Sequence, residues 1–287
     1  MKKSIKIILI AALILCAIGS VLIGIGFMTG DRNELHTTID NLHVYSQEKT
    51  PLDASVTTIN ADFAYCDFTI KASDDDRYYI AYHIDSQSST NPFSYTIDGD
   101  TLRLHESEKE GLYVHYTLPT LLSLLLSGDD EQDIDDIGSN ITLYVPKDAL
   151  KALNCQMKYG DLYLRDSNLG NVTAHLSYGD LDLTHCQWAS ASINLKYGDI
   201  DCTTLDCKGM TQLSTDDGDI ALTDSVPSDD LSIQIFTKYG DLDVNPDLYG
   251  TFTQSDDDDD GSGYERLSPT GSDVLTIKSE YGDISLQ

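Results

Sequence analysis

Alternating aspartates at residues 256–260 have the spacing in this sequence that comes closest to a metal site. Asp256, Asp258 and Asp260 are separated by single residues, as in the opening half of a calcium-binding loop. The twelfth position of such a loop is Leu267 instead of the glutamate that closes the site, and Glu265 comes two residues early. The pattern favours a flexible acidic insertion, with weak Ca²⁺ binding as the alternative. No other cofactor is expected.

A second set of carboxylates could hydrolyse a polysaccharide. Asp182, Asp201 and Asp243 share one outward position of an internal repeat, and the first two would lie about 5 Å apart on neighbouring strands. Retaining glycosidases use two carboxyl groups at about this separation. However, aromatic side chains that could support a sugar are few on this face, and Arg165 is the only arginine between residues 150 and 260. The sequence therefore favours a solvated acidic face, and an enzyme is not expected.

The cysteines offer neither a metal centre nor an evident nucleophile. They form no Cys-x-x-Cys pair and have no histidine at zinc-ligand spacing. Cys16 lies in an apolar run without the small residues that a lipoprotein site requires. A disulfide between Cys202 and Cys207 is conceivable, but the pairing is left open. The cysteines after this run are Cys66, Cys155, Cys186, Cys202 and Cys207.

An internal repeat organises the second half of the chain. Its mark is a Tyr-Gly-Asp turn, with Asp in place of Tyr once. The glycines of successive turns are 19, 19, 20, 22 and 42 residues apart. The last interval equals two periods and predicts one degenerated rung that holds the acidic insertion. The turn residues are Tyr159, Gly160, Asp161, Tyr178, Gly179, Asp180, Tyr197, Gly198, Asp199, Gly218, Asp219, Tyr239, Gly240, Asp241, Tyr281, Gly282 and Asp283. Weaker echoes occur at residues 65–67 and 98–100.

Hydrophobic alternation around each turn predicts the fold. Apolar residues precede the turn tyrosine by four and six positions and follow it by three and five. The positions expected to be buried therefore change from even to odd offsets across Gly-Asp. Such a corner keeps both flanking strands against one core. Glycine would supply a positive φ, tyrosine would stack between rungs, and aspartate would accept N–H groups of the turn. We therefore expect an all-β fold, a β-solenoid or β-helix-like stack with rungs of about 19–22 residues.

Charge excludes one class of partner. The chain carries 18 Lys and Arg against 48 Asp and Glu, a formal net charge of −30. Such a surface repels nucleic acid and anionic lipid, so neither is expected as a ligand. It suits a cation or a basic partner. Carboxylates stacked about 5 Å apart would also repel one another, and backbone N–H groups, the lysines that precede the tyrosines, or a bound cation would have to offset this.

The N-terminus predicts a membrane anchor. Residues 7–28 are 22 apolar or uncharged residues, long enough for a transmembrane helix that precedes the β stack. A cleavable signal peptide would be shorter. The basic residues 1–6 would stay in the cytoplasm, which places the rest outside the cell membrane as a single-pass protein. We expect a stalk at 29–37, an N-terminal β part at 38–150 and the repeat at 151–287, with 38–287 as one continuous domain.

Several repeat segments resemble a known family. KYGDLYL, SYGDLDL, KYGDID and EYGDISL, after an entry strand ITLYVPKDALKAL, are similar to a bacterial domain-of-unknown-function family labelled "putative adhesin". The resemblance covers roughly residues 50 to 287 and implies an all-β solenoid with Gly-Asp turns, often behind a membrane segment. It supplies no catalytic residue. Cys66, in place of a turn glycine, departs from the pattern.

The favoured function is a non-enzymatic, adhesin-like or sensory interaction module of the cell envelope, with an unknown envelope protein or glycan as partner. The alternatives are a polysaccharide-active enzyme and a Ca²⁺-stabilised surface protein. Function is expected where regularity fails, at the insert near residues 121–136 and at residues 256–260. The last rung, Tyr281 to Gln287, would form the open end of the stack and could pair edge to edge with a second copy.

Overall fold

The computed structural model describes residues 43–52, 55–108, 138–225, 230–254, 261–268 and 271–287. His43–Gln287 form one compact unit. The predicted membrane anchor at 7–28, the stalk and the insert at 121–136 lie outside the described residues, as do Asp256, Asp258 and Asp260. In the described ranges, no helix has the length and apolar character needed to cross a membrane.

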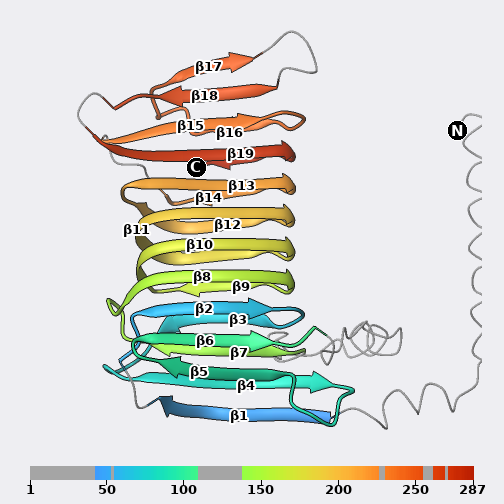
Figure 1. The fold of residues 1–287 in the computed structure, drawn as a ribbon. Helices are drawn as coiled ribbons and strands as arrows, with labels where there is room; N and C mark the ends of the chain where they lie inside the picture. Colours follow the sequence, from blue (N-terminus) through green and yellow to red (C-terminus); the bar gives the residue numbers. More distant parts are fainter. Residues whose placement is uncertain (1–42, 53–54, 109–137, 226–229, 255–260, 269–270) are drawn as a thin grey trace, which may run out of the picture. The chain divides into compact units, whose positions relative to one another are not determined.

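Twenty strands make up the described unit, and the predicted all-β class is confirmed. They form two walls (Figure 1). The first wall contains, in spatial order, β5 (Phe93–Asp98), β6 (Thr101–Glu106), β2 (Thr58–Phe63), β8 (Leu150–Tyr159), β10 (Asn168–Tyr178), the second half of β11 (Leu181–Tyr197), β13 (Met210–Asp217), β19 (Asp273–Tyr281), β15 (Leu231–Thr237), β18 (Ser262–Arg266) and β17 (Thr251–Gln254). The second wall contains β1 (His43–Leu52), β4 (Tyr78–Ser86), β7 (Asn140–Val145), β3 (Asp67–Ala72), β9 (Leu162–Arg165), the first half of β11, β12 (Ile200–Cys207), β14 (Ile220–Thr223), β20 (Ile284–Leu286) and β16 (Leu242–Val244).

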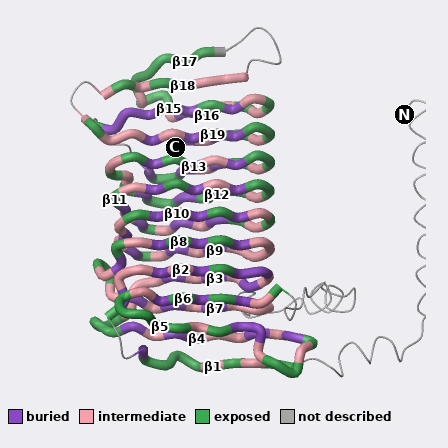
Figure 2. The backbone as a smooth tube through the Cα atoms, in the orientation of Figure 1, coloured by how far each residue is buried: buried purple, intermediate pink, exposed green. Residues whose placement is uncertain are grey.

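Parallel pairing of equivalent residues builds the stack. Val172 of β10 pairs with Leu153 on one side and Ala191 on the other, so rungs align at the period of the repeat. In the strands of the rungs, the inward residues are mostly buried and the intervening ones are mostly partly or fully exposed, the period of two that a strand gives (Figure 2). Apolar residues from both walls form a single core. Each large side chain buried there contributes about 1.5–3 kcal/mol.

The end of the stack is not the end of the chain, so the prediction for Tyr281 to Gln287 is wrong. Strand β19 pairs in parallel with β13 on one side and β15 on the other, and β20 lies between β14 and β16. The C-terminal rung therefore lies inside the stack (Figure 1). The predicted degenerate rung is also absent from the described residues. Strands β17 and β18, which flank the acidic residues 255–260 in the sequence, pair antiparallel instead.

Antiparallel strands and aromatic side chains cover both ends of the core. At one end β18 adds to β15, and the buried Tyr264 contacts Phe252 at a ring-centroid distance of 5.0 Å. At the other end β5 and β4 add to β6 and β7, with Phe93 against Tyr82 at 5.0 Å. The echo at residues 98–100 belongs to this cap, as the reverse turn between β5 and β6, and is not a rung corner. Such covered ends close the core to solvent.

Candidate functional site

The Tyr-Gly-Asp corner joins the two walls and has no room for a larger residue than glycine. Gly198 has a φ of +149°, and a Cβ there would lie 2.1 Å from the carbonyl oxygen of Gly179 in the next rung. Gly179 and Gly218 are held in the same way. Glycine is needed both for the left-handed backbone and for the close approach of successive corners.

The corner aspartates connect neighbouring rungs. Every corner carboxylate except that of Asp241, in the last rung, accepts the backbone N–H of the equivalent aspartate in the next rung: Oδ1 of Asp161 from Asp180 and Oδ1 of Asp180 from Asp199, both at 2.8 Å. The same bond recurs from Asp67 to Asp241 through the stack. The acceptor therefore serves the neighbouring turn instead of its own turn. These bonds from N–H groups offset part of the repulsion between stacked carboxylates.

The tyrosines stack in two groups. Tyr159, Tyr178 and Tyr197 lie with ring centroids 5.1 and 4.9 Å apart, and Tyr239 and Tyr281 lie 4.9 Å apart. The rings of each group are within 18° of parallel. Where the two groups would meet, the rung carries aspartate in place of tyrosine. The lysines that precede three of these tyrosines lie beside their rings, at Lys158, Lys196 and Lys238.

The corner at the opposite end of the rungs was not predicted from the sequence. In four rungs, the polar residue six positions after the turn glycine has a positive φ of 50–57° without being glycine. These residues are Asp166, His185, Thr204 and Asp224. Oδ1 of Asp166 and Nδ1 of His185 lie 3.2 Å apart. The signal was present as a polar residue at fixed spacing, and Asp is one of the residue types that tolerate this conformation.

The first corner has a different construction, because Cys66 replaces the turn glycine. Its three consecutive N–H groups, from Ala64, Tyr65 and Cys66, donate to Oε2 of Glu106 at 3.0, 2.8 and 3.0 Å. Glu106 is only 3% exposed and comes from the end of β6. A buried carboxylate thus stabilises the corner that lacks glycine.

The two candidate catalytic aspartates are neighbours, and the third is remote. Asp182 pairs in register with Asp201, whereas Asp243 lies on β16, which β14 and β20 separate from β12. Partial burial, followed by the carboxylates around it, raises the pKa of Asp201. Asp182 accepts the hydroxyl of Thr184, and Asp243 accepts the amide of Gln287. The arrangement is a crowded acidic wall.

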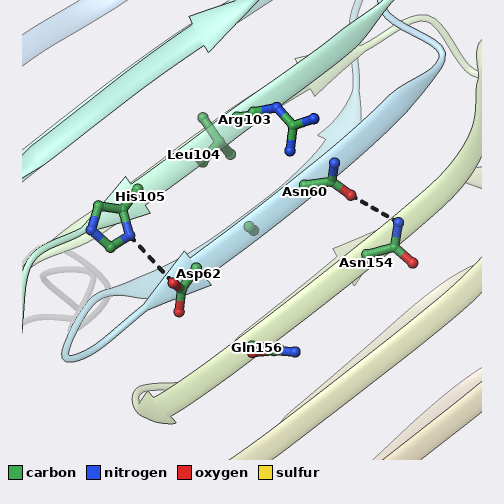
Figure 3. Close-up of a pocket in the computed structure, with 8 residues that line it drawn as sticks. Asn60, Asp62, Arg103, Leu104, His105, Asn154 and Gln156 are labelled. Carbon is green, nitrogen blue, oxygen red and sulfur yellow. Dashed lines mark hydrogen bonds and ion pairs between the residues drawn. The ribbon is translucent and has the colours of Figure 1, made fainter.

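A pocket of about 340 Å³ lies on the outer face of the first wall, over β2, β6 and β8 (Figure 3). Asn154 Nδ2 donates to Asn60 Oδ1 at 2.9 Å, and His105 Nδ1 lies 3.3 Å from an oxygen of Asp62. Arg103 is exposed beside them. The residues come from positions 60–62, 103–105 and 154–156, and the stack alone brings them together.

Two outward rows of this face are polar but uncharged through the middle of the stack, whereas the row beside the tyrosine corner carries Lys158, Lys196 and Asp216. The two uncharged rows carry amides, hydroxyls and one histidine. They contain Asn154, Gln156, Thr173, His175, Ser192, Asn194, Gln212 and Ser214. The second wall at the same rungs carries Asp182 and Asp201. A chain with a net charge of −30 therefore presents two faces of different chemistry.

The cysteines beyond residue 28 are all free in the structure, so the conceivable Cys202–Cys207 disulfide is absent from it. Burial raises the pKa of Cys155 and Cys207 to about 12 and that of Cys186 to about 11, which keeps these thiols protonated and unreactive. Across the described ranges, no group of three or more Asp, Glu, His or Cys side chains is placed to hold a metal ion.

The chain was compared with known proteins. No curated protein matches it. Among solved structures, a "putative cell adhesion protein" from Clostridium sporogenes is 11% identical, with 85% of this chain and 97% of that chain covered and a TM-score of 0.41. A "putative adhesin" from Bacteroides fragilis is also 11% identical, with 86% and 97% covered and a TM-score of 0.38. A "Putative lipid binding protein" from Parabacteroides distasonis is 12% identical, with 86% and 97% covered and a TM-score of 0.28.

The family is decided by a direct match to its sequence model. The Toastrack DUF4097 model matches residues 56–287, which include every strand of both walls except β1. The family is of unknown function, in agreement with the resemblance seen in the repeat segments. This chain belongs to the Toastrack DUF4097 family.

Proposed function

We propose that this chain is a non-enzymatic, adhesin-like interaction module, anchored by residues 7–28 and displayed outside the cell membrane, and that it binds a neutral envelope glycan. The observation that carries the proposal is the pocket over β2, β6 and β8, which continues into the two uncharged polar rows of the first wall. This surface is rigid, because each strand is bonded on both sides.

The side chains at the pocket match the chemistry of sugar hydroxyls. An amide donates and accepts in one plane, as a pair of adjacent hydroxyls does, and Arg103 adds a planar fork of donors. The hydrogen bond between Asn60 and Asn154 orients both amides. Because its two central rows carry no charge from β8 to β13, a neutral polymer can lie along them with little desolvation of ions.

The test is binding of the full-length chain, purified in a nonionic detergent, to an array of neutral envelope glycans. Arg103→Ala and Asn154→Ala should each weaken binding about three- to tenfold, the loss expected for one or two hydrogen bonds. The matched control is Thr203→Ala on the exposed face of the second wall. Equal affinity in all three variants, or failure of the wild-type chain to retain any glycan, would refute the proposal.

A polysaccharide-active enzyme is the second candidate, supported by the adjacency of Asp182 and Asp201 and by the raised pKa of Asp201. A raised pKa is what a general acid needs. The test is release of reducing ends from envelope polysaccharide by the wild-type chain and by Asp201→Ala. Turnover that disappears in Asp201→Ala would replace the binding proposal. A third candidate, stabilisation of the protein by Ca²⁺ at Asp256, Asp258 and Asp260, predicts heat of binding in a calorimetric titration with millimolar Ca²⁺.

A further inference from the structure

The tyrosine ladder is interrupted at one rung. Strand pairing places Asp217 directly between Tyr197 on β11 and Tyr281 on β19. Tyr197 stacks on Tyr178 and Tyr281 stacks on Tyr239, each at a ring-centroid distance of 4.9 Å. Within the described residues, no other ring stacks on Tyr197 or Tyr281. Each of the two rings therefore turns one face toward the rung of Asp217.

The interruption leaves a slot with a carboxylate at its base. Two rung spacings of about 4.8 Å separate the planes of the two rings, and the thickness of the rings leaves a gap of about 6 Å. The aspartate side chain is shorter than tyrosine, so it ends below the outer part of the rings. Tyr197 is 37% exposed, Tyr281 is 51% exposed, and Asp217 is also exposed. The slot is thus open to solvent.

Its chemistry selects a cation. Aromatic faces carry partial negative charge and attract ammonium groups, most strongly where two rings enclose the ion. In the part of the chain that the structure describes, no side chain forms a hydrogen bond or ion pair with the Asp217 carboxylate. Lys196 lies 5.0 Å from the centre of the Tyr197 ring without pairing with Asp217.

Lys196 has the same place in its rung as Lys158 has in a rung without a gap. Lys158 lies beside Tyr159 at a similar distance of 5.4 Å, although rings stack on both faces of Tyr159. Lys158 therefore reaches its ring from the side, and the same approach by Lys196, which precedes Tyr197 in the same way, would leave the gap open. The slot itself is left for a cation from another molecule.

We propose that the gap at Asp217 binds an alkylammonium group, the group that ends a lysine side chain on a partner protein. A methylene and its ammonium are about 4 Å thick, so they fit between the rings in van der Waals contact with at least one face. The carboxylate supplies the counter-charge. The site is separate from the glycan pocket, and either proposal can fail without the other.

The test is a titration of the full-length chain in nonionic detergent with N-acetyl-lysine methylamide, at constant ionic strength. Tyrosines carry ¹³C in their rings, and Tyr197→Phe and Tyr281→Phe identify the two signals. The rings of Tyr197 and Tyr281 should shift with one common dissociation constant, whereas Tyr159, covered on both faces, should not. The acetyl-arginine analogue and choline, titrated in parallel, show whether lysine is preferred among cations.

Three variants separate a built slot from general attraction to an acidic protein. Asp217→Asn should weaken binding up to about fivefold, the value of one exposed ion pair. Asp217→Tyr completes the ladder, so it should abolish the shifts at Tyr197 and Tyr281 and raise the melting temperature. Asp76→Asn removes the same charge from an exposed turn in the distant cap and should change the constant by less than about 1.5-fold. Uniform shifts in all tyrosines, no shifts, or unchanged binding in Asp217→Tyr would each overturn the proposal.

Discussion

Replacement of Glu106 tests how the irregular first corner is stabilised. Its Oε2 accepts three backbone N–H groups at 2.8–3.0 Å, and its side chain is almost fully buried. Glu106→Ala removes the acceptor and leaves three donors without a partner at the turn that carries Cys66 in place of glycine.

The expected cost is large. An unpaired buried donor costs about 1–3 kcal/mol, but Tyr65 is only half-buried and water can reach its N–H. Two fully buried donors, together with the lost charge of the acceptor, give about 3–5 kcal/mol for Glu106→Ala. Glu106→Gln keeps the shape and one acceptor oxygen, so it should cost about 1–2 kcal/mol.

The assay is urea unfolding, followed by the fluorescence of Trp188, the single tryptophan, which is 1% exposed in the core. The matched control is Glu108→Ala, two residues away, which breaks only an exposed ion pair with Lys158 and should cost less than about 1 kcal/mol. If Glu106→Ala and Glu108→Ala have the same free energy of unfolding, the carboxylate does not stabilise the corner. Should Glu106→Ala fail to fold, the comparison of Glu106→Gln with Glu108→Gln decides.

Three further outcomes follow from the corners, the acidic wall and the thiols. Gly198→Ala should lower the free energy of urea unfolding by about 3–5 kcal/mol, because its Cβ meets the Gly179 carbonyl. The control Gly99→Ala, with φ +64° and open space around it, should lower it by only about 1–2 kcal/mol. Equal losses in the two variants would contradict the close approach at Gly198. The pKa of Asp201 is raised above the ordinary 3.8, so the folded protein binds this proton more tightly and its stability falls as pH rises from 3.8 through the raised value. Asp201→Asn should therefore raise the melting temperature near pH 7 and leave it unchanged below about pH 3, and no gain at neutral pH would exclude the crowding. Site-resolved alkylation should find the described cysteines slow to react in the native protein and all reactive after unfolding, with or without prior reduction; an increase on reduction would reveal a disulfide between them. These are Cys66, Cys155, Cys186, Cys202 and Cys207.

Sequence alone predicted the local design of the rungs. The change of buried parity across Gly-Asp is a short-range pattern, and Leu153, Cys155 and Leu162 are buried as it requires. The need for glycine at the corner is likewise local, because a positive φ is a property of one residue. The acceptor role of aspartate could be inferred, but its partner could not, since the N–H belongs to a residue 19 to 94 positions away.

Tertiary structure decided which rungs are neighbours. Several strands with similar sequences compete for the same edge, and β19 pairs with β13 and β15. The hydrophobic alternation of each strand is equally compatible with every order of the strands in the stack. For the same reason the carboxylate of Glu106, about 40 residues from the corner that it stabilises, could not be assigned from sequence. The pocket needs residues from three strands far apart in the chain, and the slot at Asp217 needs Tyr281 beside it in place of Tyr239. Hydrophobic alternation specifies which face of a strand is buried, whereas the contacts that form a site depend on long-range pairing.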